Sequence, residues 1–96
     1  MYHSISMPEF DVMYRRNRDL NILDVREEDE YKRGHIPGAK SIPLSDFPFE
    51  LKKGNDYYVI CQSGARSAAA CQYLANNGYE VTNVIGGMST WKGEKV

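Results

Sequence analysis

Residues 56–67 have the sequence DYYVICQSGARS, in which a strand pattern passes through a cysteine into a helix pattern. The first part, Asp56–Ile60, is rich in β-forming residues without interruption, as is typical of a strand covered on both faces. Cys61 follows at once, and a helix is predicted over residues 66–77, where several alanines and Leu74 supply helix propensity and a packing face. A buried strand that leads through a short loop into a helix indicates an α/β fold.

Short strand and helix patterns alternate along the rest of the chain. Ser6 and Glu9 have the spacing of a capping box at the start of a first helix, and Pro43 suits an edge strand, where its missing N–H is not needed. Strands are predicted over residues 2–6, 21–25, 41–44, 56–60 and 81–85, with further short helical segments over residues 27–32 and 88–92. We therefore expect a five-stranded, mostly parallel sheet with helices on both faces. In this sheet, residues 56–60 are central and residues 41–44 lie at or near an edge.

The length and charge of the chain narrow the classes of function. Its 96 residues suffice for one domain, over residues 1–96. The net charge of −1 argues against a nucleic-acid partner, which calls for a basic face. No apolar run approaches the ~20 residues of a membrane helix, and residues 1–10 lack the basic and apolar stretches of a signal peptide. We expect a monomer in the cytoplasm, with no membrane partner.

The chain has two cysteines, Cys61 and Cys71. Cytosolic thiols are normally reduced, so a structural disulfide is not expected. Two cysteines without a Cys/His cluster make a poor zinc site, and we expect neither a metal nor a cofactor. Cys71 lies in the middle of an alanine-rich helix pattern, which favours an inert, buried thiol. Cys61 is expected to be the only fast-reacting thiol at neutral pH.

The loop after Cys61 has the composition of an anion-binding site. Gly64 and its small neighbours allow a tight curl in which successive backbone N–H groups point inward. The start of the next helix adds unpaired N–H groups and the positive end of its dipole. Arg66 adds a full charge and a fork of donors that matches an oxyanion. Together these features would lower the pKa of Cys61 and favour its thiolate, although an inert buried cysteine at a strand end is the alternative.

Four segments of the chain, in order, resemble a rhodanese domain. They are residues 23–27 (LDVRE), 34–39 (GHIPGA), 61–67 (CQSGARS), and 86–87 (GG) with Trp91. Each segment is weak evidence alone, but their order and spacing make the resemblance strong, and it covers residues 21–91.

The resemblance implies a sulfurtransferase. Such an enzyme moves a sulfane sulfur from a small anionic donor such as thiosulfate to an acceptor. The acceptor is cyanide or a thiol, and the thiol can belong to another protein. Cys61 would be the catalytic nucleophile that becomes a persulfide. The substrate-binding residues would be those of the loop and the helix start: Gln62, Ser63, Gly64, Ala65, Arg66 and Ser67. Ser63 and Ser67 have the alternative role of capping the helix that follows. Since a domain of this size has little room to enclose a substrate, we expect an open, shallow pocket.

Two other classes of function remain as alternatives. A phosphatase or arsenate reductase of related architecture would carry a longer loop, Cys-x5-Arg, that fits a phosphate, whereas this chain has Cys-x4-Arg between Cys61 and Arg66. A non-catalytic binding or regulatory module would be expected to lack the cysteine. The length of the loop argues against the first alternative and the presence of Cys61 argues against the second.

Four residues outside the loop have both a functional and a structural interpretation. Asp24 and Arg26 end the second predicted strand, so they should lie at the same sheet edge as Cys61 and support its charge. The favoured alternative is that they form a structural ion pair with each other or with a neighbour. His35 is expected to satisfy backbone groups, and Trp91 is expected to pack in the core.

Overall fold

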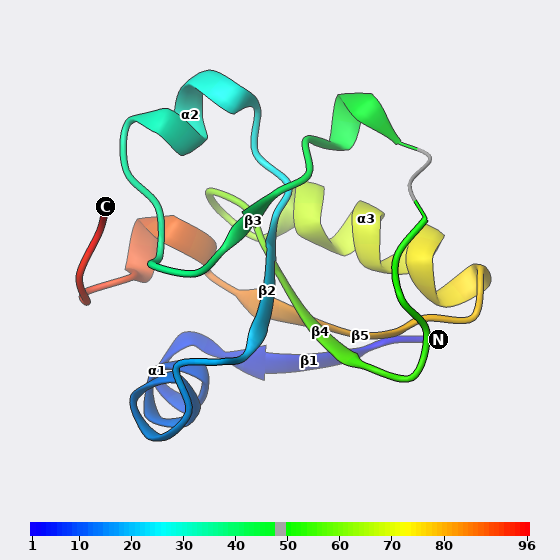
Figure 1. Ribbon diagram of the computed structural model, residues 1–96, viewed down its shortest axis with the longest axis horizontal. Helices are drawn as coiled ribbons and strands as arrows, with labels where there is room; N and C mark the ends of the chain where they lie inside the picture. Colours follow the sequence, from blue (N-terminus) through cyan, green and yellow to red (C-terminus); the bar gives the residue numbers. More distant parts are fainter. Residues whose placement is uncertain (48–49) are drawn as a thin grey trace.

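The computed structural model describes residues 1–47 and 50–96, which form a five-stranded sheet with helices on both faces (Figure 1). The spatial order is β1-β5-β4-β2-β3, and every neighbouring pair is parallel. The strands are β1 (His3–Ser6), β2 (Asn21–Asp24), β3 (Lys40–Ser41), β4 (Asp56–Ile60) and β5 (Glu80–Ile85). The expected central place of residues 56–60 is confirmed, as is an edge position for the strand near residue 41.

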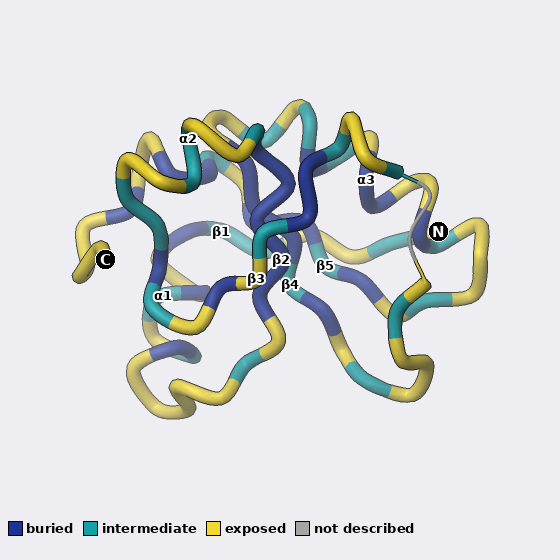
Figure 2. The backbone as a smooth tube through the Cα atoms, turned by 45° about the horizontal axis from the view of Figure 1, so that its top comes forward, coloured by how far each residue is buried: buried dark blue, intermediate teal, exposed yellow. Residues whose placement is uncertain are grey.

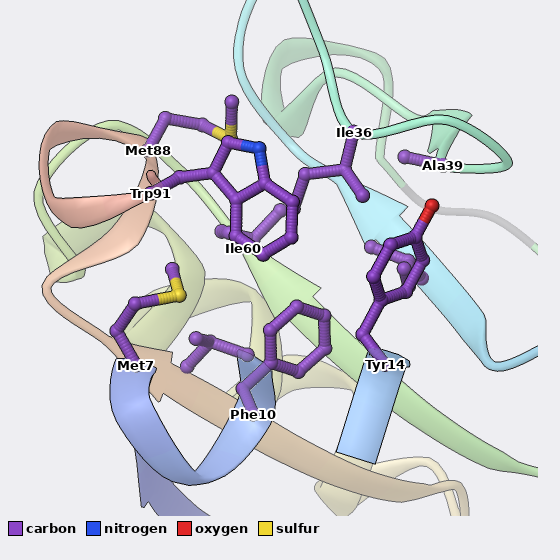
Figure 3. Packing of buried hydrophobic residues seen from close by; sticks show 10 residues of the cluster. Met7, Phe10, Tyr14, Ile36, Ala39, Ile60, Met88 and Trp91 are labelled. Atoms are coloured by element: carbon purple, nitrogen blue, oxygen red, sulfur yellow. The ribbon is translucent and has the colours of Figure 1, made fainter. Parts of the chain in front are cut away.

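Two apolar cores lie on opposite faces of the sheet. On one face, α1 (Met7–Arg16) packs with a 3₁₀ turn, η2 (Gly87–Thr90). Figure 3 shows Phe10 and Tyr14 of α1 gathered there with Trp91 and Met88. On the other face, α3 (Ala65–Asn76) packs Ala70, Cys71 and Leu74 against β2, β4 and β5. Buried stretches of the backbone therefore follow the central strands, while the connecting loops are mostly exposed (Figure 2).

The capping box predicted at the start of α1 is present. The backbone N–H of Glu9 donates to Ser6 Oγ at 3.3 Å, and the backbone N–H of Ser6 donates to Glu9 Oε1 at 3.4 Å. Both bonds satisfy N–H groups that a helix start leaves without partners. Because Ser6 is also the last residue of β1, this cap fixes where the chain leaves the sheet and turns back over it.

The strand predicted over residues 41–44 is wrong in its extent. Strand β3 comprises Lys40–Ser41 only, and a 3₁₀ turn occupies Leu44–Asp46. The chain still follows β2 for a short way, since the N–H of Ile42 donates to Asp24 O. The N–H of Leu44 donates to Val25 O at 3.1 Å, so the missing N–H of Pro43 removes no bond to β2; the carbonyl of Pro43 accepts from the N–H of Asp46 and begins the turn. The backbone therefore curls into a turn where the β pattern of the side chains suggests a longer strand.

The remaining helices lie at the carboxyl ends of the strands. The short helix α2 (Glu28–Lys32) follows β2 and buries no residue of its own. In the described part of the chain, no helix has the length and apolar character required to cross a membrane. In a parallel sheet the carboxyl ends share one edge, so α2, which follows β2, and η2, which follows β5, lie at the same end of the molecule (Figure 1), and Cys61 directly follows β4 at that edge.

Candidate active site

Cys61 lies between the end of β4 and the start of α3, at the base of a tight loop. The N–H of Gly64 donates to Cys61 Sγ at 3.0 Å. Gly64 adopts a φ of +106°, which places it in the left-handed region that other residues avoid, and this turns the chain into α3. The loop therefore curls around the sulfur, as its composition predicts. The remaining loop residues, Gln62, Ser63 and Ala65, are exposed.

The sulfur of Cys61 is less accessible than an open pocket implies. The residue has 0% exposure. Burial raises its pKa, but hydrogen bonds from the Ser67 hydroxyl and from backbone N–H groups of Ser67, Gly64 and Ser63 outweigh burial and lower the pKa of Cys61 overall. The direction of this shift agrees with the expectation from the composition of the loop, while the sulfur itself is enclosed by the fold.

The loop is held from outside by η2. The N–H of Met88 donates to Cys61 O at 2.8 Å, and the N–H of Ser89 donates to Gln62 O at 2.9 Å. Because the oxygen and the N–H of a peptide unit point in opposite directions, holding these two carbonyls toward η2 turns the N–H groups of Gln62 and Ser63 to the other side. A Cβ built on Gly87 would lie 2.3 Å from Cys61 O, so only glycine permits this approach. The sequence singles out Gly86-Gly87, but nothing in it shows this contact.

A buried polar chain extends from Cys61 to β5. Cys61 Sγ lies 3.3 Å from Ser67 Oγ, which lies 2.5 Å from Asn83 Oδ1. The Asn83 amide nitrogen also donates to Gly64 O at 3.4 Å. Ser67 is 0% and Asn83 6% exposed. The sequence analysis missed Asn83, although a polar residue between Val81 and Val84 in a β-branched strand is a visible signal.

Arg66 is tied to a residue that the sequence analysis also missed. Its two terminal nitrogens donate to the carboxylate oxygens of Glu30 in α2, at 2.5 and 2.9 Å. Hydrogen bonding from Arg66 lowers the pKa of Glu30 from 4.5 to about 2, although partial burial opposes this shift. The folded-state pKa lies below the unfolded one, so this pair stabilises the fold above pH 4.5 and loses that effect as the pH falls toward 2.

Asp24 and Arg26 form a buried ion pair with each other. Arg26 donates through Nε at 2.9 Å and through a terminal nitrogen at 2.7 Å to the Asp24 carboxylate, and it also donates to Gly34 O at 2.9 Å. Asp24 is 0% exposed, so its charge depends on this partner. The arrangement matches the structural alternative, because these groups bind each other and the backbone of the loop after α2.

His35, Trp91 and Cys71 make structural contacts. The His35 ring stacks on Tyr31, with ring centroids 3.7 Å apart, and its Nδ1 lies 2.9 Å from Tyr31 O. Trp91 is buried, and its indole N–H donates to Glu94 O at 2.9 Å. Burial and the neighbouring Cys61 raise the pKa of Cys71 to about 12, so Cys71 stays protonated at neutral pH.

A polar cavity of about 340 Å³ opens beside the loop at Gln62. Its lining carries more cationic than anionic side chains, and consists of Arg26, Glu30, Arg33, Gly34, Gln62, Met88 and Lys95. Arg26 is paired with Asp24, Arg33 with Asp29 at 3.2 Å and Glu30 with Arg66, so the net positive charge of this lining comes from Lys95. A small anion can therefore be accommodated next to the residue that follows Cys61.

Comparison with known proteins relates the chain to one family. The family described as "Rhodanese-like domain" matches residues 7–94. Thiosulfate sulfurtransferase GlpE of Coxiella burnetii is 34% identical over 96 residues, which cover 96% of this chain and 89% of that protein. A crystal structure of a rhodanese-like domain protein from Staphylococcus aureus is 38% identical and superimposes with a TM-score of 0.87, over 96% of this chain and 92% of that one.

The relatives differ in how much of their length the chain covers. YrkF of Bacillus subtilis is 40% identical over 94 residues, which are 94% of this chain but 51% of that protein. The chain therefore spans about half of YrkF and most of GlpE.

Proposed function

Since the chain belongs to the rhodanese-like family, we propose that it transfers a sulfane sulfur from thiosulfate or a similar anionic donor to a thiophilic acceptor, through a persulfide on Cys61. Relatives named as sulfurtransferases, such as GlpE, support a rhodanese-type sulfurtransferase. The donor, the acceptor and the persulfide are the finer parts of the proposal.

In the first step, the Cys61 thiolate attacks the outer sulfur of thiosulfate. A bond forms between Sγ and that sulfur, and the sulfur–sulfur bond of the donor breaks, so that sulfite leaves with the electron pair. Cys61 becomes a persulfide anion. The N–H of Gly64 and the Ser67 hydroxyl, which lie 3.0 and 3.3 Å from Sγ, are placed to stabilise negative charge on the sulfur.

In the second step, an acceptor takes the outer sulfur. A thiolate acceptor becomes a persulfide itself, or cyanide becomes thiocyanate, and the Cys61 thiolate is regenerated with the bonding electrons. No oxidant or reductant is consumed, because each step exchanges one sulfur bond for another. This is covalent catalysis, in which one transfer is split into two easier ones.

One observation carries the proposal: a buried cysteine whose sulfur accepts a loop N–H bond and whose pKa is lowered despite its burial. An inert structural cysteine in an apolar core has a raised pKa, as Cys71 does. The same protein therefore contains an internal reference for what an unreactive buried thiol looks like.

The test is the intact mass of the protein after incubation with thiosulfate. We expect a gain of one sulfur atom per chain, which a thiol reductant removes and which peptide mapping locates on Cys61. Incubation with sulfite instead of thiosulfate serves as the control, since sulfite carries no sulfane sulfur. A parent protein whose mass is unchanged by thiosulfate would sink the proposal.

Arg66→Ala is expected to lower kcat/KM for thiosulfate by about ten- to a hundredfold, the effect of losing a charge-assisted partner worth about 1.5–3 kcal/mol. Glu30 occupies one edge of the guanidinium, but a guanidinium has five N–H donors, so others remain for an anion. Arg66→Lys should recover only part of the loss, because an ammonium cannot bind two oxygens as a fork. The measurement is steady-state kinetics.

Glu30→Gln is the matched control for this prediction. It keeps the Arg66 charge while weakening its anchor, so its loss in kcat/KM should be the smaller of the two. If kcat/KM falls equally in the two variants, then activity depends on the Glu30–Arg66 ion pair and not on binding of the donor by Arg66. Circular dichroism confirms that each variant is folded.

The proposal extends to the cellular compartment and to the acceptor. Both cysteines are free thiols in the structure, and free thiols suit a reducing compartment such as the cytoplasm. The acceptor in the cell is proposed to be a thiol, which has to reach the sulfur held on the buried Cys61.

A further inference from the structure

Ser67 has one hydroxyl proton and three neighbours that can accept it. They are Cys61 Sγ at 3.3 Å, Gly64 O at 3.1 Å and Asn83 Oδ1 at 2.5 Å. Only a bond to Sγ stabilises the thiolate or the persulfide anion. What decides where the Ser67 proton points therefore bears directly on the reactivity of Cys61.

Gly64 O, the acceptor closest to Ser67 along the chain, would take the hydroxyl proton away from the sulfur. Gly64 O lies three residues before Ser67, and a serine hydroxyl in the first turn of a helix readily bonds back to such a carbonyl. Asn83 competes for this carbonyl, since its Nδ2 donates to Gly64 O at 3.4 Å. Asn83 therefore contacts both the hydroxyl and its competing acceptor.

We propose that Asn83 is a positioning residue for sulfur transfer: by changing from acceptor to donor toward Ser67, it directs the Ser67 hydroxyl proton to Cys61 Sγ when that sulfur is an anion. This inference rests on the proposed function. With Cys61 as a thiol, the S–H donates to Ser67 Oγ and the Ser67 hydroxyl donates to Asn83 Oδ1. With Cys61 as an anion, the Ser67 hydroxyl donates to Sγ, and the Asn83 amide turns to donate its own N–H to Ser67 Oγ. This turn gives up the 3.4 Å bond from Asn83 Nδ2 to Gly64 O, which keeps the Ala68 N–H as its donor.

An asparagine suits this role because its side chain both accepts and donates. Its strand places it well, since Asn83 pairs in register with Val59, two residues before Cys61. Both Asn83 and Ser67 are buried, so water does not readily replace either partner. The charged and titratable groups near Cys61 are Arg66 with its partner Glu30, and the protonated Cys71. The side-chain hydrogen bonds of Asn83 go to Ser67 and Gly64 and to none of these groups.

The test is a double-mutant cycle on the pH dependence of Cys61 alkylation by iodoacetamide. Asn83→Leu should raise the pH midpoint, because Ser67 then bonds to Gly64 O, and alkylation at neutral pH should slow by about tenfold for the loss of one hydrogen bond to a charged sulfur. Ser67→Ala should raise the midpoint as well. Adding Asn83→Leu to Ser67→Ala should produce no further change, since Asn83 acts through Ser67.

Val81→Ala is the matched control. Val81 lies on the same strand and the same face, is 2% exposed, and has an apolar side chain that packs in the core and cannot hydrogen-bond to Ser67. It should lower stability and leave the midpoint unchanged. If Asn83→Leu does not fold, Asn83→Ser in the same cycle replaces it.

Three outcomes overturn the inference. The Asn83 variant can have the same pH midpoint as the parent, it can have a lower midpoint, or Asn83→Leu can shift the midpoint by the same amount in the parent and in the Ser67→Ala protein. Alkylation does not require sulfur transfer. A parent that gains no sulfur from thiosulfate therefore refutes the proposed function alone, while the cycle still decides the role of Asn83.

Discussion

Cys61→Ser is expected to abolish the proposed sulfur transfer, because a hydroxyl cannot form a persulfide. The expected result is no gain of sulfur from thiosulfate and no turnover above the buffer rate, in a protein that remains folded. Serine is close in size to cysteine and the neighbouring N–H of Gly64 can donate to its hydroxyl, so the loop is expected to persist. Intact mass and a turnover assay with cyanide as acceptor measure the two effects.

Cys71→Ala is the control for this substitution. Cys71 is fully buried in α3 and its pKa is raised to about 12, so its removal should leave both readouts near those of the parent. If the Cys61→Ser protein still takes up sulfur, or the Cys71→Ala protein does not, then Cys71 is the nucleophile and the assignment to Cys61 is wrong.

Gly87→Ala is expected to reduce turnover by about a hundredfold or more, as displacement of a reacting group by about 1 Å does. The added Cβ would lie 2.3 Å from Cys61 O and 2.8 Å from Gln62 O, and these are backbone atoms that cannot rotate away. Either η2 or the loop must move, and the N–H bonds from Met88 and Ser89 to the loop are then lost. Thiosulfate kinetics measure the effect on the site, and urea unfolding measures the effect on stability.

Gly54→Ala separates backbone strain from this collision. Gly54 also has a positive φ, +92° against +58° for Gly87, but a Cβ there meets nothing within 4 Å. Gly54→Ala therefore loses stability through backbone strain alone, at a position remote from Cys61. If the two variants lose stability alike and neither loses turnover, the contact between η2 and the loop has no part in catalysis.

The sequence predicts well what depends on neighbours along the chain. Strand β4 matches its predicted bounds because an unbroken β-rich run has one plausible structure, and the capping box at Ser6 matches because its two members are three residues apart. The predicted strand over residues 41–44 ends early for a local reason too, since the Pro43 carbonyl accepts from the Asp46 N–H and a 3₁₀ turn follows, although the N–H groups of Ile42 and Leu44 still donate to β2 and the residue after it.

The missed residues depend on contacts between distant segments. Glu30 lies 36 residues from Arg66 in sequence. Its helix begins with three consecutive acidic residues, and nothing in the sequence indicates which of them pairs with Arg66. Asn83 reaches Ser67 because β5 pairs beside β4 in one particular register. That register follows from the packing of the whole sheet, so the pattern within β5 shows a polar residue without showing its partner.

The contact between η2 and the loop also bears on how such sites can diverge or be redesigned. The inward N–H groups are set by two carbonyls that the backbone of residues 88–89 holds, and Gly87 lies directly against them. Inserting one residue between Cys61 and Arg66, to make the wider cradle that a phosphate fits, would shift these carbonyls out of register with their donors. A successful change of loop length therefore has to rebuild residues 86–89 at the same time. Grafting CQSGARS alone onto another strand–helix junction would transfer the nucleophile without the scaffold that orients its surroundings.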